Sequence, residues 1–76
     1  MNIDEFVTNF ASQLDDTDPS EITATTVFRD LDEWSSLTAL SIIAMIYEEY
    51  DVTLRGDDVK NSTTVEDLYN AVKSKL

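Results

Sequence analysis

Cysteine and histidine are absent from this 76-residue chain, which also has only one glycine, one proline and five basic residues. The absence of cysteine excludes disulfide staples and a thiol nucleophile. The absence of histidine removes the commonest general base, and no acid–base pair is spaced so that it would meet in a pocket. No apolar stretch approaches the roughly 20 residues that a membrane span requires. The chain is therefore expected to be neither an enzyme nor a membrane-spanning protein.

Negative charge dominates the composition: sixteen acidic residues stand against five basic ones, a formal net charge of −11. Such a chain repels nucleic acid and anionic membranes, because no basic stripe is left to neutralise phosphates. We expect protein partners with basic surfaces, no nucleic acid and no membrane. Residues 1–5 have neither the positive region nor the apolar region of a signal peptide, so a cytoplasmic location is expected. The chain is expected to act as a monomer.

The length and an apolar fraction of 42% predict one small folded domain over residues 1–76. Its predicted fold class is all-α, a small bundle of three main helices plus one short helix. Apolar residues recur at helical spacing from Ile3 to Leu14 and predict the first helix. The acidic segment from Asp15 to about Ser35 carries the only proline and predicts a long loop. Three apolar side chains are expected to hold that loop to the core: Val27, Phe28 and Leu31.

The segment from Ser36 to Tyr50 is predicted to form the central helix. Apolar side chains cover a very wide arc of it: Leu37, Ala39, Leu40, Ile42, Ile43, Ala44, Ile46, Tyr47 and Tyr50. The remaining, outward arc holds Thr38, Ser41, Glu48 and Glu49, with Met45 alone among them. A flexible apolar side chain on a polar face often marks a partner surface, which makes Met45 a candidate docking residue.

The last third of the chain predicts two further helices. After a short extended link over residues 51–54, Gly56 to Lys60 is expected to form one or two helical turns. Thr63 and Glu66 then match a capping box, in which Thr63 accepts the backbone N–H of Glu66 and Glu66 reaches back. The last helix is expected to turn five residues inward: Val65, Leu68, Tyr69, Val72 and Leu76.

Ser36 lies where the acidic loop turns into the apolar central helix. A serine there offers an exposed hydroxyl beside unpaired backbone N–H groups and the positive end of the helix dipole, a setting suited to a phosphate ester. Alternatively, Ser35 or Ser36 simply caps the helix. With Ser35 as the cap, Ser36 takes the first helical position and its hydroxyl faces solvent. No metal is expected: an EF-hand loop starting at Asp16 fails at positions six and twelve, which hold Glu21 and Val27.

The whole chain resembles an acyl carrier protein in its length, its acidity, its long first loop, the Ser-Leu that opens the second helix and the Thr-Thr-Val before the last. In that family the serine of an Asp-Ser-Leu motif receives 4′-phosphopantetheine from coenzyme A, and that position is Ser36, followed by Leu37. Ser35 replaces the motif aspartate, which keeps a capping oxygen but loses a charge that the family's transferases can use. The resemblance implies a non-catalytic carrier that holds an acyl or related cargo as a thioester on this arm, in fatty-acid-like or specialised metabolite biosynthesis.

The resemblance also implies partners: a phosphopantetheinyl transferase, and acyl-transferring or synthase enzymes with basic docking surfaces. Six residues of the central helix are the candidate contacts: Leu37, Thr38, Ser41, Met45, Glu48 and Glu49. A cargo could also find shelter among apolar residues of the bundle: Leu40, Ile43, Ala44, Ile46, Val65 and Leu68. Two alternatives stay open, an aminoacyl or peptidyl carrier with the same modified serine, and an acidic helical adaptor that is never modified. The sequence does not choose among cargoes, pathways or cognate enzymes.

Overall fold

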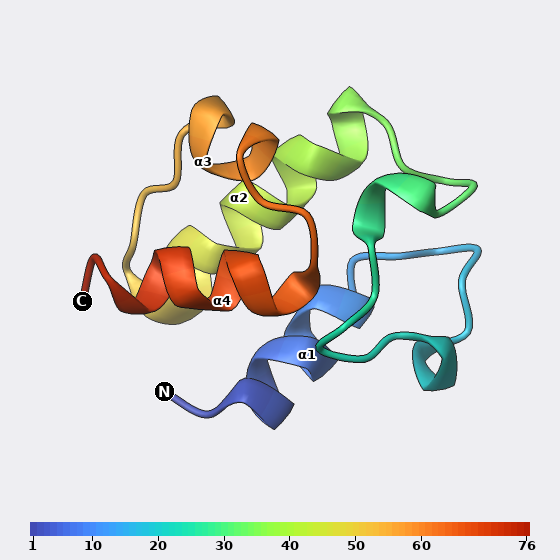
Figure 1. The fold of residues 1–76 in the computed structure, drawn as a ribbon, viewed down its shortest axis with the longest axis horizontal. Coiled ribbons are helices and arrows are strands. Elements are labelled where there is room, and N and C mark those ends of the chain that lie inside the picture. The colour runs from blue at the N-terminus through green and yellow to red at the C-terminus, as the bar shows by residue number, and fades with distance from the viewer.

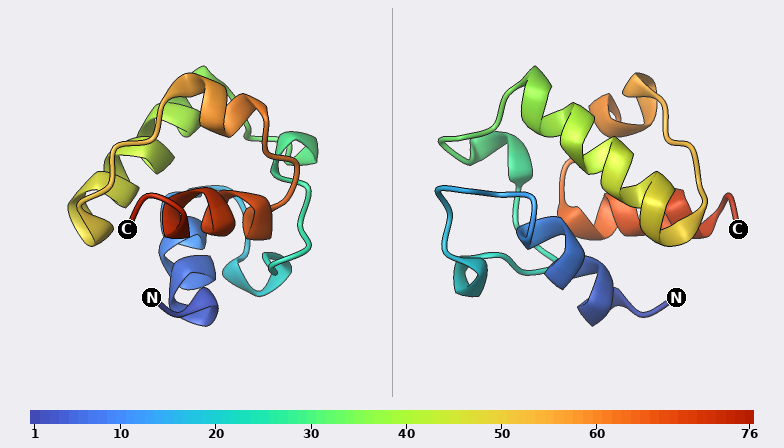
Figure 2. Two further views of the ribbon diagram at one scale, coloured as in Figure 1. Left: turned by 60° about the vertical axis from the view of Figure 1, so that its left-hand side comes forward. Right: turned by 180° about the vertical axis from the view of Figure 1, so that it is seen from behind.

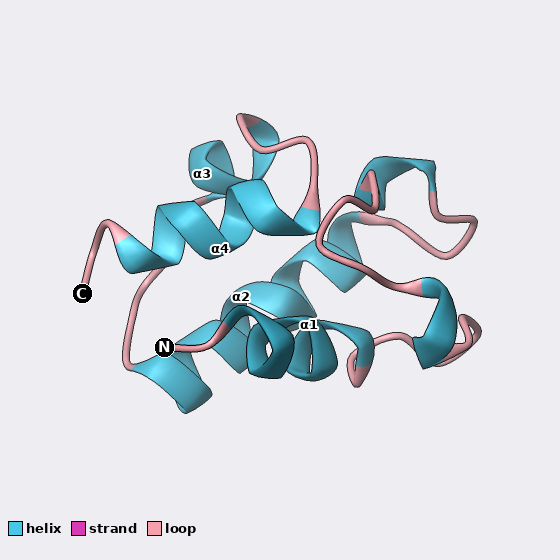
Figure 3. Cartoon of the chain, turned by 60° about the horizontal axis from the view of Figure 1, so that its bottom comes forward, coloured by secondary structure: helices cyan, strands magenta, loops and turns pink.

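A computed structural model of residues 1–76 contains four α-helices, α1 (Ile3–Ala11), α2 (Ser36–Tyr50), α3 (Gly56–Lys60) and α4 (Val65–Lys73). The chain has no strand, and helices and loops make up the whole cartoon of Figure 3. The predicted bundle of three main helices plus one short helix is therefore confirmed. None of the four helices combines the length and apolar character that would let it cross a membrane.

The helices surround one apolar core. Helix α1 packs against both α2 and α4, and α3 lies against α4. Figures 1 and 2 show the loop between α1 and α2 on one side of the molecule and both termini on the opposite side. Fifteen buried apolar residues from the helices and their connections form the core, with Phe6, Phe10, Phe28, Ile42 and Ile46 fully buried. The long loop contributes Ile22 and Phe28 to this core.

Helix α1 begins as its sequence predicts but ends earlier. The Asn2 side chain caps it, because Asn2 Oδ1 accepts the backbone N–H of Asp4 at 2.7 Å and that of Glu5 at 3.3 Å. After Ala11 the chain tightens into a turn, in which the N–H of Leu14 donates to the carbonyl of Ala11 at 3.0 Å. Leu14 is nevertheless buried. The apolar period predicted its burial correctly, although it lies beyond the regular helix.

The predicted capping box of the last helix is wrong by one residue. Thr64, not Thr63, is the cap: its hydroxyl accepts the N–H of Asp67 at 3.2 Å, and Asp67 Oδ2 accepts the N–H of Thr64 at 3.0 Å. An isolated antiparallel bridge between Val27 and Thr64 holds Thr64 extended, so that the helix begins after it. Leu76, expected on the inner face, is exposed because α4 ends at Lys73.

Two short 3-10 turns, Pro19–Glu21 and Phe28–Asp30, interrupt the long loop. Phe28 is fully buried, with its ring 4.7 Å from that of Trp34 and 6.1 Å from that of Phe10, centroid to centroid. Leu31 is half-buried and packs against the core, whereas Val27 is half-buried and pairs with Thr64 in the isolated bridge. Phe28 and Leu31 therefore hold the loop to the core as predicted, while Val27 attaches it to the residue before α4 through the backbone.

Asp51 caps the C-terminal end of α2 and is the only residue with a positive φ (55°). Its carboxylate also stands at the negative end of the helix dipole, in a chain that is already acidic. We expect Asp51→Asn to raise the melting temperature by about 1–6 °C, because asparagine tolerates the left-handed conformation and removes the charge. Asp57→Asn is the control, since it removes the same charge from the favourable first turn of α3. Equal gains from both variants would show that only net charge matters.

Candidate functional site

The two consecutive serines at the start of α2 have different roles in the structure. Ser35 is the N-cap: its Oγ accepts the N–H of Thr38 at 3.3 Å, and its carbonyl accepts the N–H of Ala39 at 3.0 Å. Ser36 is the first helical residue and is exposed, and its hydroxyl makes no hydrogen bond within the protein. The backbone N–H groups of Ser36 and Leu37 belong to the first turn and have no helical acceptor. Ser36 therefore presents a free hydroxyl beside two free donors.

An open groove of about 490 Å³ begins at these serines and runs between α2, α3 and the 3-10 turn at Phe28–Asp30. Its lining combines apolar and basic side chains: Arg29, Trp34, Ser35, Ser36, Ala39, Leu40, Ile43, Gly56, Val59 and Lys60. Leu40 and Ile43 belong to the cargo shelter suggested by the sequence. Ile46, Val65 and Leu68 are instead fully buried in the closed core. Space for an arm or cargo thus lies along the surface of α2, not inside the bundle.

Glu33 ties the loop after α1 to the start of α2. Its carboxylate accepts three hydrogen bonds: from the N–H groups of Asp15 and Asp16, each at 2.9 Å, and from the hydroxyl of Thr17 at 2.6 Å. The Thr38 hydroxyl donates to the backbone carbonyl of Glu33 at 2.8 Å. The Thr17 hydroxyl, with the two backbone N–H groups, lowers the pKa of Glu33 below its ordinary value of 4.5. The ionised carboxylate of Glu33 therefore holds residues 15–17 of the loop against the segment that leads to Ser36.

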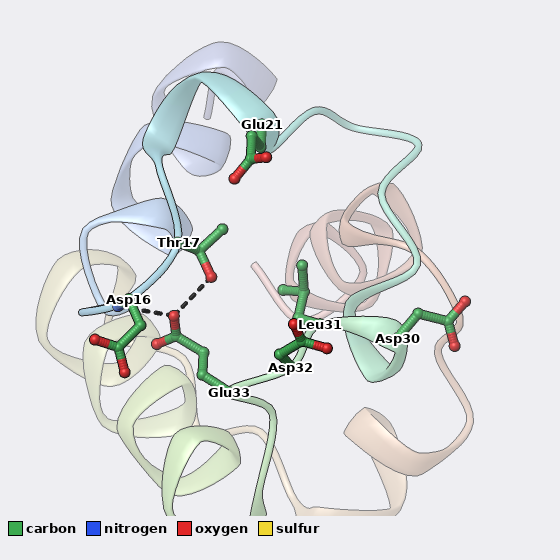
Figure 4. Close-up of a pocket in the computed structure, with 7 residues that line it drawn as sticks. All are labelled: Asp16, Thr17, Glu21, Asp30, Leu31, Asp32 and Glu33. Atoms are coloured by element: carbon green, nitrogen blue, oxygen red, sulfur yellow. Dashed lines mark hydrogen bonds between the residues drawn. The ribbon is translucent and has the colours of Figure 1, made fainter.

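Figure 4 shows a second, acidic hollow formed by the long loop that precedes α2. Its volume is about 470 Å³, and five of its seven lining residues are acids: Asp16, Glu21, Asp30, Asp32 and Glu33. No group of three or more potential ligands is arranged to hold a metal ion. The hollow therefore contributes a concentration of negative charge close to Ser36, which would favour the approach of a basic partner.

The orientation predicted for α2 is wrong by about a quarter turn. Met45, expected on the outward face, is only 5% exposed and belongs to the core. Leu37, Leu40 and Tyr47 are 76%, 61% and 57% exposed. We call the exposed side of the helix its outer face, made of Leu37, Leu40, Ser41, Ala44, Tyr47 and Glu48. This surface is more apolar than the sequence suggested.

The other candidate contacts divide between this face and the interior. Leu37, Ser41 and Glu48 lie on the outer face, and Glu49 is exposed beside it. Thr38 is half-buried, and its hydroxyl is engaged by the carbonyl of Glu33. Thr38 is thus a structural residue, and its predicted place on the outward arc is wrong.

Sequence reasoning missed four residues of the surface around Ser36: Leu40 and Tyr47 on the outer face, and Arg29 and Lys60 in the groove. The exposure of Leu40 and Tyr47 could not be predicted from the sequence, because the helix is apolar around most of its circumference. Arg29 and Lys60 lie 31 positions apart and meet only through tertiary structure. The scarcity of basic residues was the one signal that could have singled out these two.

Comparison with known proteins gives one result. Residues 4–72 match a family model described as a phosphopantetheine attachment site. No curated protein and no solved structure gives a significant match. The match spans both serines, the groove and the outer face of α2.

The Glu33 network predicts a pH-dependent loss of stability. The pKa of Glu33 is lower in the folded chain, so its carboxylate stabilises the fold above the unfolded pKa, and this contribution disappears as the pH falls through the folded value. We expect Glu33→Gln to lower the melting temperature at pH 7 and to have little effect near pH 2, measured by circular dichroism. Glu48→Gln removes the same charge from an exposed position without hydrogen bonds. A Glu33→Gln effect that is unchanged by pH would contradict the role of the carboxylate.

Proposed function

The chain belongs to the phosphopantetheine attachment family, and from this premise we propose that Ser36 is the serine that carries its 4′-phosphopantetheine. Proteins of this family attach the group covalently to a serine and are generally non-catalytic carriers. The observation that carries the assignment is the free, exposed hydroxyl of Ser36 in the first turn of α2, next to a cap that Ser35 already supplies.

The environments of the other serines support this choice. The chain has seven serines, and five of them use their hydroxyl in a hydrogen bond: Ser12, Ser20, Ser35, Ser62 and Ser74. Only Ser36 and Ser41 have free hydroxyls. Ser41 lies in the interior of α2, where the backbone N–H groups are used by the helix. Ser36 alone combines a free hydroxyl with unpaired N–H groups that can stabilise a phosphate.

The bonds formed on attachment are simple. Ser36 Oγ forms a phosphodiester with phosphorus from coenzyme A, its proton passes to the transferase, and adenosine 3′,5′-bisphosphate leaves. The arm supplies a terminal thiol, and with it the thioester chemistry that a chain without cysteine lacks. The residues of this chain would hold and orient the arm. Ser35 and Glu33 fix the start of α2, and the groove offers an apolar wall of Ala39, Leu40, Ile43 and Val59. We infer an acyl carrier that serves fatty-acid-like or specialised metabolite biosynthesis, since an apolar wall suits acyl chains.

We further propose that partner enzymes dock on the outer face of α2. A carrier domain implies a transferase and synthase-type enzymes as partners. Leu37, Leu40 and Tyr47 offer apolar area that is not covered within the chain. Glu48, Glu49 and the acidic hollow would attract a basic enzyme surface from a distance, while the apolar contacts would hold the complex together.

The assignment of Ser36 is tested by labelling with a fluorescent coenzyme A analogue and a transferase of broad specificity, followed by intact mass. We expect Ser36→Ala to abolish labelling without loss of stability. Ser35→Ala should still be labelled, but should lose about 0.5–2 kcal/mol of folding free energy because the helix loses its cap. Labelling that survives Ser36→Ala and fails in Ser35→Ala would move the site by one residue. A wild-type chain that never gains the arm would favour the unmodified adaptor.

The docking face is tested by comparing exposed and buried side chains of α2. We expect Tyr47→Ala to weaken binding to the transferase about tenfold or more, measured by calorimetry, with little change in stability. Met45→Ala should instead destabilise the fold by about 2–5 kcal/mol, because it leaves a cavity in the core. Leu76→Ala is the matched control, since Leu76 is an exposed apolar residue far along the chain from α2. Normal binding by Tyr47→Ala would place the docking surface elsewhere.

A further inference from the structure

The groove that begins at Ser36 carries positive charge, although the chain is strongly acidic. Two of the five basic residues, Arg29 and Lys60, line it. Neither forms an ion pair, because the only salt bridge in the protein joins Lys75 to Asp58 at 3.8 Å. Arg55 and Lys73 are also free of ion pairs but lie outside the groove. The chain thus places two unneutralised cations beside its proposed modification site, despite having sixteen acids.

The guanidinium of Arg29 is held in a fixed position. Its Nη2 donates to the carbonyl of Val59 at 2.8 Å and to the carbonyl of Lys60, where α3 ends. The guanidinium carbon also lies 5.2 Å from the centre of the Phe28 ring, and Phe28 is fully buried. The N–H groups on Nε and Nη1 make no hydrogen bond within the protein. Arg29 therefore presents unused, preorganised donors, an arrangement well suited to an oxyanion.

The hydrogen bond to the Lys60 carbonyl fixes the guanidinium of Arg29 at the end of α3, and Lys60 lines the same groove. No carboxylate lies within ion-pair distance of either cation. A bound anion would supply the missing counter-charge and would use the free donors of Arg29. The apolar lining between them and Ser36, which includes Ala39 and Ile43, reduces the competition from water.

We propose that Arg29 and Lys60 bind an oxyanion that the prosthetic arm brings into the groove. This inference rests on the proposed attachment to Ser36. The anion has two possible sources with the same chemistry: the phosphodiester on Ser36 itself, or a carboxylate at the far end of an acyl cargo. In both cases the anion is tethered, so its effective concentration is high and modest ion pairs suffice to bind it.

The test compares four states of the protein: without the arm, with the arm alone, with a hexanoyl cargo and with an adipyl cargo, which has a carboxylate at its far end. Each state is prepared in the wild type, in Lys60→Gln and in Lys60→Glu, and loading is verified by intact mass. Lys73→Gln is the matched control, because Lys73 is an exposed cation without an ion pair on α4, outside the groove. Melting temperatures are measured in low and high salt, together with the ³¹P chemical shift of the phosphodiester.

We expect loading to raise the melting temperature of the wild type by about 2–5 °C more than that of Lys60→Gln, a gap that salt reduces. A gap already present with the bare arm, with a changed ³¹P shift, would identify the phosphodiester. A gap seen with adipyl but not hexanoyl cargo would identify the carboxylate. Lys60→Glu should enlarge the gap in either case, and Lys73→Gln should show none.

Failure of this inference can be told apart from failure of the proposed function. If the arm is attached but Lys60→Gln behaves like wild type and Lys73→Gln in all four states, the groove binds no anion and Ser36 remains the attachment site. If intact mass shows no arm on wild-type protein, the proposed function fails and this inference fails with it. Arg29→Gln is not used as the primary variant, because Arg29 also holds α3 through two carbonyls.

Discussion

Phe28 packs against Phe10 of α1 and against Trp34, which directly precedes the two serines. The rings of Phe10 and Trp34 are nearly parallel, with an interplanar angle of 7° and centroids 6.4 Å apart, and this three-ring contact joins the first helix to the end of the long loop. The functional surface depends on it in two ways. Trp34 forms part of the groove wall, and Arg29, adjacent to Phe28 in the chain, reaches α3 only because Phe28 is fixed in the core. A loop of this length without such a contact would leave the start of α2 poorly positioned.

Charge is sorted to two sides of Ser36. On one side, the hollow around Glu33 contains several carboxylates. The carboxylate of Glu33 itself accepts hydrogen bonds that order the loop. On the other side, the groove collects two of the few cations. Under the proposed function, the acidic hollow would attract a basic enzyme, while the groove would hold an anion on the arm. The strong net charge of −11 therefore does not describe the immediate surroundings of the proposed modification site.

Much of the fold follows from the sequence, because the helices have clear apolar periods and the loop has clear breakers. The number, order and type of helices, the cap at Ser35 and the burial of Phe28 are all local or strongly patterned features. The rotation of α2 could not be predicted in the same way. Apolar residues cover most of that helix, so both Met45 and Tyr47 are compatible with burial, and packing against α1 selects Met45. The cap at Thr64 and the pairing of Arg29 with the end of α3 depend on segments more than 25 positions apart.

Helix α2 divides into two sides: one packs into the core, and the other is the apolar outer face, which stays exposed. In a chain of 76 residues, the core needs only one side of its longest helix, represented by Ile42, Met45 and Ile46. Leaving Leu37, Leu40 and Tyr47 exposed forgoes burial that would otherwise add stability, and such a surface in a small acidic domain invites association. The high negative charge opposes association between copies of the chain, since like-charged molecules repel, but it does not oppose a basic enzyme. If partners dock on this face as proposed, charge would restrict which proteins reach it, and the apolar contacts would determine how long they stay bound.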